Sequence, residues 1–308
     1  MRKTVLTVLC LFSFVPYAFS QSYSLASGSV ERNPADMALA SSAVASDKDI
    51  SFAALRNSAV LPFSDCKADI SASYAPWAPS SGGSKFINVG AGFNFNQRWG
   101  LSIAGSYGMG SSYEVIDDYG ASQGTFTTSS MLIGVGLGFK MTDFLSIGAD
   151  FRYVSEKLSA DGSKGSFNAG VYVLGRVAGS LNITAGVSSL GPKVIAASGE
   201  SFSMPSSALL GAYYPWKISR AHVLSVSADG RFYFKGGVNA AAGLQYCWKK
   251  RLSVRAGYHY GSAKAPTGSY ASVGLGVRIF KGLHLDAAYL LGNATLKNTF
   301  SAGFGYCF

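Results

Sequence analysis

Charged residues are scarce in this sequence, and so are long apolar runs. Only 14% of the 308 residues are charged, whereas a globular domain typically has about 25%. After residue 21 no apolar run reaches the roughly 20 residues that a membrane-spanning helix needs, which argues against a helical membrane protein. The low charge also disfavours an ordinary soluble domain, because charged side chains normally cover such a surface.

Glycine and aromatic residues are abundant instead, with 37 glycines and 13% aromatics. The N-terminus has the features of a secretory signal. Arg2 and Lys3 precede the apolar stretch "TVLTVLCLFSFVPYAF", and "AFS" before Gln21 is a small-x-small cleavage site. We therefore expect residues 1–20 to be a cleavable signal peptide that exports the chain, in preference to an uncleaved anchor.

Apolar and polar residues alternate in many segments of about ten residues. In "LSIGADFRY", Leu145, Ile147 and Phe151 fall on one face, and Asp150 and Arg152 fall on the other. The same pattern recurs in "LSVSADGRF", "LSVRAGYHY" and "ASVGLGVRI", each with an arginine on its polar face. An apolar face towards lipid and a polar face towards a lumen is typical of a transmembrane β-barrel.

The sequence contains fourteen such segments, an even number that suits a barrel. The predicted strands are 67–76, 85–95, 99–108, 125–139, 144–155, 166–176, 181–189, 205–215, 221–232, 236–247, 251–261, 269–280, 283–292 and 298–308. Mostly short connections alternate with longer ones such as 109–124, 156–165 and 190–204, as periplasmic turns alternate with outer loops. We predict an all-β fold, a 14-stranded antiparallel barrel over residues 67–308 in the outer membrane of a Gram-negative bacterium. The alternative is a soluble periplasmic β-sandwich.

Aromatic residues lie beside the predicted short turns, where an interfacial girdle would form. They are Phe95, Trp99, Phe139, Phe144, Trp216, Trp248, Phe280 and Phe308. The expected surroundings are outer-membrane lipid and lipopolysaccharide, whose anionic headgroups suit a chain with a net charge of +10, although solvated turns explain that charge equally well.

Residues 21–66 do not alternate, and they resemble the N-terminus of the FadL-like outer-membrane barrels, most closely the PorV/PorQ branch associated with type IX secretion. Met37-Ala38-Leu39-Ala40 stands where that family has Met-Gly-Gly-Ala, and "SAVASDKDISFAALRNSA" follows its continuation. The family's Asn-Pro-Ala is replaced by Asn57-Ser58-Ala59. The resemblance implies that residues 21–66 form a plug inside the barrel. Small inward residues such as Gly134, Gly136 and Gly138 leave room for it, or serve strand curvature.

Charges predicted to face the lumen are candidates for holding this plug, because a charge inside a lumen has to be paired or hydrated. On the wall they are Asp150, Arg152, Asp229, Arg231, Arg255, Arg278 and Asp286, and on the plug side they are Asp47, Asp49 and Asp65. Several of these arginines are expected to pair with plug carboxylates.

The cysteines Cys66 and Cys307 lie at the start of the first strand and the end of the last one, which barrel closure makes neighbours. We predict a disulfide between them, favoured by the oxidising periplasm, or else free buried thiols.

Nothing in the sequence indicates catalysis, a cofactor or a nucleic-acid-binding module. His259 and Ser262 are a residue pair of the kind found in membrane lipid hydrolases, but no third residue can be assigned to orient them. His284 and Asp286 share the inward face of one strand, where a lumen hydrogen bond is favoured over a metal site or a proton relay. We expect no enzyme and no metal site.

Three functions fit these observations. The resemblance favours a PorV/PorQ-like component of type IX secretion that receives or tethers exported proteins, with secreted proteins or other secretion components as partners. The second is FadL-like passive uptake of a hydrophobic small molecule. The third is a structural or general-diffusion barrel. Uptake predicts an apolar path through the lumen, for which the inward residues are Phe86, Leu132, Tyr172, Leu174 and Leu290.

Overall fold

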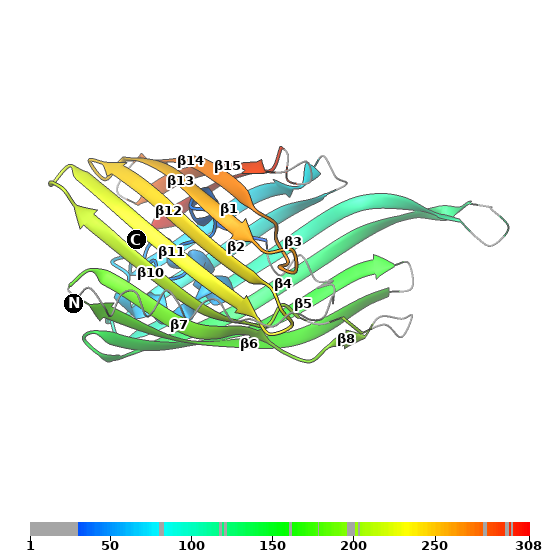
Figure 1. Ribbon diagram of the computed structural model, residues 1–308, viewed down its shortest axis with the longest axis horizontal. Coiled ribbons are helices and arrows are strands. Elements are labelled where there is room, and N and C mark those ends of the chain that lie inside the picture. The colour runs from blue at the N-terminus through cyan, green and yellow to red at the C-terminus, as the bar shows by residue number, and fades with distance from the viewer. Residues whose placement is uncertain are drawn as a thin grey trace.

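Fourteen antiparallel strands close into a barrel in the computed structural model, which confirms the predicted fold class (Figure 1). The structure describes residues 30–79, 83–116, 119, 122–159, 162–177, 179–195, 201–202, 204–279, 282–292, 296 and 298–308. The predicted signal peptide, the first residues of the predicted plug and Phe280 lie outside the described residues.

Each predicted strand corresponds to one strand of the barrel. The strands are β1 Ala68–Trp77, β2 Ser84–Phe95, β3 Trp99–Ile116, β4 Ser122–Thr142, β5 Leu145–Ser159, β6 Gly162–Val177, β7 Leu181–Leu190, β10 Ser207–Lys217, β11 His222–Tyr233, β12 Val238–Trp248, β13 Leu252–Gly261, β14 Tyr270–Arg278, β15 Leu283–Gly292 and β16 Phe300–Cys307. Neighbours in the barrel are neighbours in the chain, and β1 pairs with β16 to close it. The connection between β7 and β10 contains a two-stranded sheet of β8 (Val194–Ile195) and β9 (Ser201–Phe202).

Side chains alternate along each strand as the sequence pattern predicts. On β5, Ile147 and Phe151 are exposed on the outer surface, whereas Ser146, Asp150 and Arg152 are buried inside the barrel. The exposed apolar residues form a continuous lipid-facing surface, and closure of the ladder leaves no unpaired strand edge in it. The predicted girdle residues Phe95, Trp99, Phe144, Trp216, Trp248 and Phe308 are all exposed.

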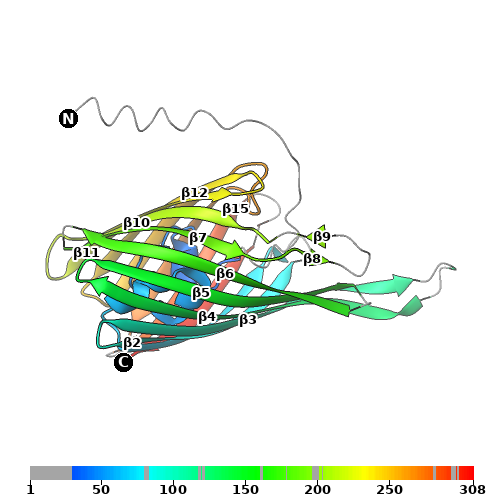
Figure 2. The same ribbon diagram turned by 90° about the horizontal axis from the view of Figure 1, so that it is seen from below.

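The two ends of the barrel differ. At one end the strands are joined by tight turns, and in two of them both central residues have positive φ: Asn96 with Gln97, and Lys249 with Lys250. This conformation matches the twist of a hairpin. At the other end β3 and β4 extend beyond their neighbours as a long hairpin (Figure 2). The sequence pattern predicts a loop at 109–124, but the β-forming residues there continue the ladder with two register shifts.

Short helical turns lie inside the barrel (Figures 1 and 2). They are α2 Pro34–Ala38, η2 Ile50–Phe52, α3 Ala53–Arg56 and η3 Ser58–Phe63. Within the described residues, no helix has the length and apolar character required to cross a bilayer.

Candidate functional site

The segment from Val30 to Cys66 lies inside the barrel, its helical turns fill the middle of the lumen, and we call it the plug. Two of its turns, α2 and η3, begin at an asparagine side-chain cap. Asn33 accepts a hydrogen bond from the amide of Ala35 and precedes Pro34 at the first position of α2, and Asn57 accepts from the amide of Ala59 at the start of η3. The Asn57 side chain also donates to the carbonyl oxygen of Val44 at 2.9 Å, which ties two parts of the plug together.

Glycines on the wall allow the plug backbone to approach the strands closely. A β-carbon on Gly90 or Gly92 of β2 would overlap the carbonyl oxygens of Ser51 and Ile50. On β4, a β-carbon on Gly138 would overlap the carbonyl oxygen of Ser58. Of the two interpretations of these glycines, room for a packed backbone is therefore the one that the structure supports.

An ion pair between Arg56 and Asp36 lies at the centre of the plug, and both side chains are 6% exposed. Arg56 also donates to the carbonyl oxygens of Ser46 at 3.1 Å and Lys48 at 3.3 Å. Burial by itself would lower the pKa of Arg56, but the negative charges of Asp36, Glu31 and Asp49 and the hydrogen bond to Asp36 together outweigh burial and raise it. The guanidinium therefore stays charged and joins three parts of the plug.

Polar wall residues hold the plug through its backbone. Arg152 donates from Nε to the carbonyl oxygen of Ala54 at 3.0 Å, and Asp229 accepts from the amide of Val44 at 3.0 Å. Asp150 accepts from the hydroxyl of Ser58. Three of the predicted lumen charges thus contact the plug, but they bind amide, carbonyl and hydroxyl groups.

The expected pairing of the predicted wall arginines with plug carboxylates is wrong for the described contacts. Arg152 pairs with Asp150 at 2.7 Å, and Arg255 pairs with Asp286 at 2.5 Å, so each of these arginines is neutralised within the wall. Arg231 and Arg278 line two separate cavities. The periodicity showed which residues face inward, but not which of them would meet, because that depends on strand stagger.

The plug carboxylates have other neighbours. Asp47 pairs with Arg176 at the end of β6, a residue that the sequence pattern does not single out. Asp65 pairs with Lys48 at 2.8 Å, and the hydrogen bond from this ammonium group lowers the pKa of Asp65. Asp49 approaches Asp69 of β1 and His284 of β15.

The apolar residues suggested for a ligand path are all buried, and they pack in different clusters. Phe86 packs with Val30, Leu132 packs with Leu55, and Leu290 belongs to the cluster around Met37. Tyr172 and Leu174 join the cluster that contains Val44 and Leu61. The five residues are therefore spread over four clusters, each of which includes plug residues.

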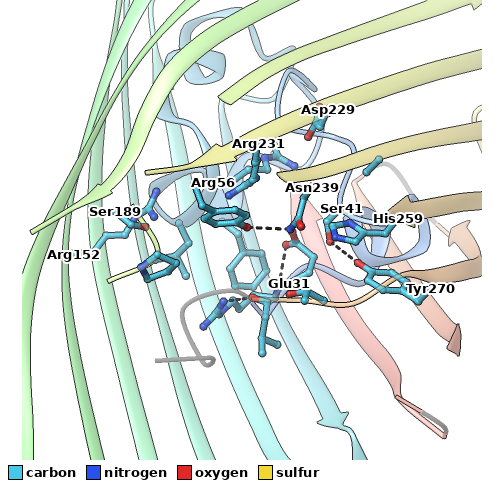
Figure 3. Close-up of a pocket in the computed structure, with 18 residues that line it drawn as sticks. Glu31, Ser41, Arg56, Arg152, Ser189, Asp229, Arg231, Asn239, His259 and Tyr270 are labelled. Atoms are coloured by element: carbon cyan, nitrogen blue, oxygen red, sulfur yellow. Dashed lines mark hydrogen bonds between the residues drawn. The ribbon is translucent and has the colours of Figure 1, made fainter. Parts of the chain in front are cut away.

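A cavity of about 70 Å³ lies on the outer side of the plug, and we call it the vestibule (Figure 3). Its floor is formed by plug residues that include Phe52, Leu55 and Arg56. Its walls come from β5, β7 and β11–β14, with both aromatic and charged side chains. The wall residues include Arg152, Ser189, Arg231, Tyr233, Ala241, His259 and Tyr270.

A larger cavity of about 550 Å³ lies on the other side of the plug, beside the short turns, and we call it the chamber. Charged and polar side chains from the plug and from the strand ends line it, Asp47, Arg176, Arg278 and Asp286 among them. The structure contains a disulfide between Cys66 and Cys307, both of which border the chamber. It joins the end of the plug to the last strand, beside the β1–β16 seam.

The fold and the plugged lumen define a class: an outer-membrane β-barrel closed by its own N-terminal segment. A family model described as "Outer membrane protein beta-barrel domain" matches residues 40–175. No curated protein sequence matches the chain.

Solved structures share the whole fold. A FadL homologue from Pseudomonas aeruginosa has 13% sequence identity and a TM-score of 0.58, covering 91% of this chain and 99% of its own. The CymD monoaromatic hydrocarbon channel has 10% identity and a TM-score of 0.66, covering 93% of this chain and 99% of its own. The Ralstonia pickettii toluene transporter TbuX has 11% identity and a TM-score of 0.58, covering 83% of this chain and 93% of its own. The fold is therefore FadL-like.

Proposed function

We propose that the protein is a passive transporter that admits a hydrophobic small molecule through the outer membrane. The observation that carries this proposal is the division of the lumen into a vestibule and a chamber by a tightly packed plug. A general-diffusion pore needs an open aqueous channel, and this plug occupies that space. The FadL-like structures named as a monoaromatic hydrocarbon channel and a toluene transporter support the same function by fold analogy.

A hydrophobic molecule would enter the vestibule from outside and meet Phe52 and Leu55 on the plug. We infer that its exit is lateral, at a bulge between β6 and β7. Ala169 pairs with Leu190 and Val171 with Val187, so β7 has one more residue than β6 in this interval. Ser189, in the bulge, has a φ of 58° and lines the vestibule.

Uptake of a labelled monoaromatic hydrocarbon by cells or proteoliposomes containing the protein tests this proposal. Ala241→Trp, on the vestibule wall, is expected to reduce uptake at least tenfold by filling the cavity. The matched control is Ala242→Trp, because Ala242 is the next residue of β12 and faces outward. Equal uptake by the two variants, or uptake no faster than in protein-free vesicles, would contradict the proposal.

A second candidate function is a PorV/PorQ-like role in type IX secretion, which the resemblance of the plug sequence supports. The projecting β3–β4 hairpin offers an outer surface that could contact exported proteins. Pull-down from native membranes, with mass spectrometry of both proteins and lipids, separates the two functions. Recovery of exported proteins without a bound apolar compound would favour secretion.

A further inference from the structure

One group of titratable side chains lies on the chamber side of the plug, away from the vestibule. Asp49 of the plug, Asp69 of β1 and His284 of β15 each place one potential ligand atom within 4.8 Å of the others. Gly305 of β16 is the register partner of His284 and leaves space for the imidazole. A β-carbon there would lie 2.5 Å from Nε2 of His284.

The imidazole of His284 is oriented as in a metal site. Its Nδ1 lies 2.9 Å from Oδ2 of Asp286, and Asp286 is held in turn by Arg255 at 2.5 Å. A carboxylate bound to Nδ1–H leaves the lone pair on Nε2, which is how metal-binding histidines are usually fixed. Among the described residues Nε2 has no hydrogen-bond partner, and His284 is only 9% exposed.

The two carboxylates complete a mixed oxygen and nitrogen ligand set. Asp69 is 1% exposed, and its Oδ2 accepts a hydrogen bond from the amide of Ser51 at 3.2 Å, which fixes its position. Its Oδ1 lies 3.7 Å from Nε2 of His284, too far for a hydrogen bond. Asp49 precedes η2 with a φ of 51° and lines the chamber, from which water can fill a remaining coordination position.

We propose that Asp49, Asp69 and His284 bind a divalent transition-metal ion, for which Zn²⁺ is the suitable probe. Imidazole suits Zn²⁺, whereas Ca²⁺ and Mg²⁺ prefer ligand sets made of oxygen alone. The ion would join the plug to β1 and β15, the strands on either side of β16 near the Cys66–Cys307 disulfide. It would also offset the negative charge of Asp49 and Asp69, whereas Asp286 already forms an ion pair with Arg255.

The competing explanation is an imidazolium ion of His284 that bridges Asp69 and Asp286 without a metal. Zinc titration of the chelator-treated full-length protein in detergent, in competition with a chromophoric chelator, distinguishes the two. The proposal predicts one zinc equivalent with at least tenfold preference over Mg²⁺ and Ca²⁺. Absence of stoichiometric zinc binding would overturn it.

Variants then assign the ligands. Asp49→Asn and His284→Gln are each expected to weaken zinc binding at least tenfold, and Asp286→Asn about 10- to 100-fold through loss of imidazole orientation. Asp65→Asn is the control, because Asp65 lines the same chamber but pairs with Lys48. Zinc binding that is unchanged in both Asp49→Asn and His284→Gln would place the ion elsewhere and overturn the proposal.

A second measurement on the wild-type protein does not depend on the folding of any variant. Zinc-edge X-ray absorption of the loaded protein should show nitrogen and oxygen ligands at about 2.0–2.2 Å and no sulfur. Sulfur in the first coordination shell would instead assign the zinc to a cysteine and would contradict the proposal.

Discussion

A β-carbon placed on Gly136 of β4 would overlap the hydroxyl oxygen of Ser58 in the plug. It would also come within 2.9 Å of the α-carbon of Ala54, so two turns of the plug lie against this one backbone position. The plug can therefore pack directly against the β4 backbone only because residue 136 is a glycine and has no side chain.

Replacement of Gly136 by valine is expected to displace the plug from its contact with β4. The cost should be about 1–3 kcal/mol in the free energy of unfolding, because the surrounding backbone cannot easily move away. Urea titration in detergent measures this loss, and planar-bilayer recordings should show added ion conductance where the plug is displaced. Gly105→Val is the control, since the nearest atom to its β-carbon would lie 3.8 Å away. Equal effects of the two substitutions would argue against a tightly seated plug.

Removing one partner of the buried Arg56–Asp36 ion pair should destabilise the protein more than removing both. Arg56→Met leaves the Asp36 carboxylate buried without its counter-charge, at a cost of about 3–5 kcal/mol. The double variant Arg56→Met with Asp36→Leu removes both charges and should recover most of that stability. A double-mutant cycle on plug proteolysis or urea unfolding measures the difference, and additive effects would mean that the pair is not coupled.

The disulfide between Cys66 and Cys307 links residues 241 positions apart in the chain. Substitution of both cysteines by alanine should lower stability by about 2–5 kcal/mol, mainly by freeing the unfolded chain. Peptide mass spectrometry without reduction identifies the bridge, and unfolding curves give its contribution. Cys247→Ala serves as the control, since Cys247 is a free thiol on β12. Recovery of Cys66 and Cys307 as free thiols from native membranes would contradict this prediction.

Much of the barrel could be predicted from sequence because its lipid-facing and lumen-facing sides impose period-two alternation on every strand. For this reason Ile147 of β5 faces outward and Asp150 faces the lumen, as predicted. The outer ends were harder to predict. Residues 109–116 of β3 extend beyond the rim, where neither lipid nor a lumen imposes the pattern, and the exposed Tyr113 and Ile116 continue the strand without it.

The plug contacts could be predicted only in part. Alternation indicates that Arg152 faces inward, but its contact with the carbonyl oxygen of Ala54 depends on how an irregular segment folds inside the lumen. Arg176 does not stand out in the sequence because it ends a strand beside a short turn, where a solvated charge is common. A usable sequence signal for the proposed metal site is Asp69, an acidic residue on the lumen face of the first strand.

Arg176 provides a test of how the chamber side of the plug is held. Its guanidinium pairs with Asp47, donates to the carbonyl oxygen of Phe63 at 3.3 Å, and lies 4.4 Å from the centre of the Phe63 ring. Arg176→Met keeps an extended apolar side chain but loses these charged contacts. The plug should then open more often, by about tenfold for each 1.4 kcal/mol lost.

Trypsin cleavage after Lys48 reports this opening, because proteolysis follows the population of the open form when opening and closing are fast. Arg251→Met is the matched control, since Arg251 also lines the chamber but is exposed. Faster cleavage in Arg176→Met but not in Arg251→Met would show that the Arg176 contacts keep this part of the plug closed. Equal cleavage rates in both variants and the wild type would mean that packing on the wall glycines is sufficient without them.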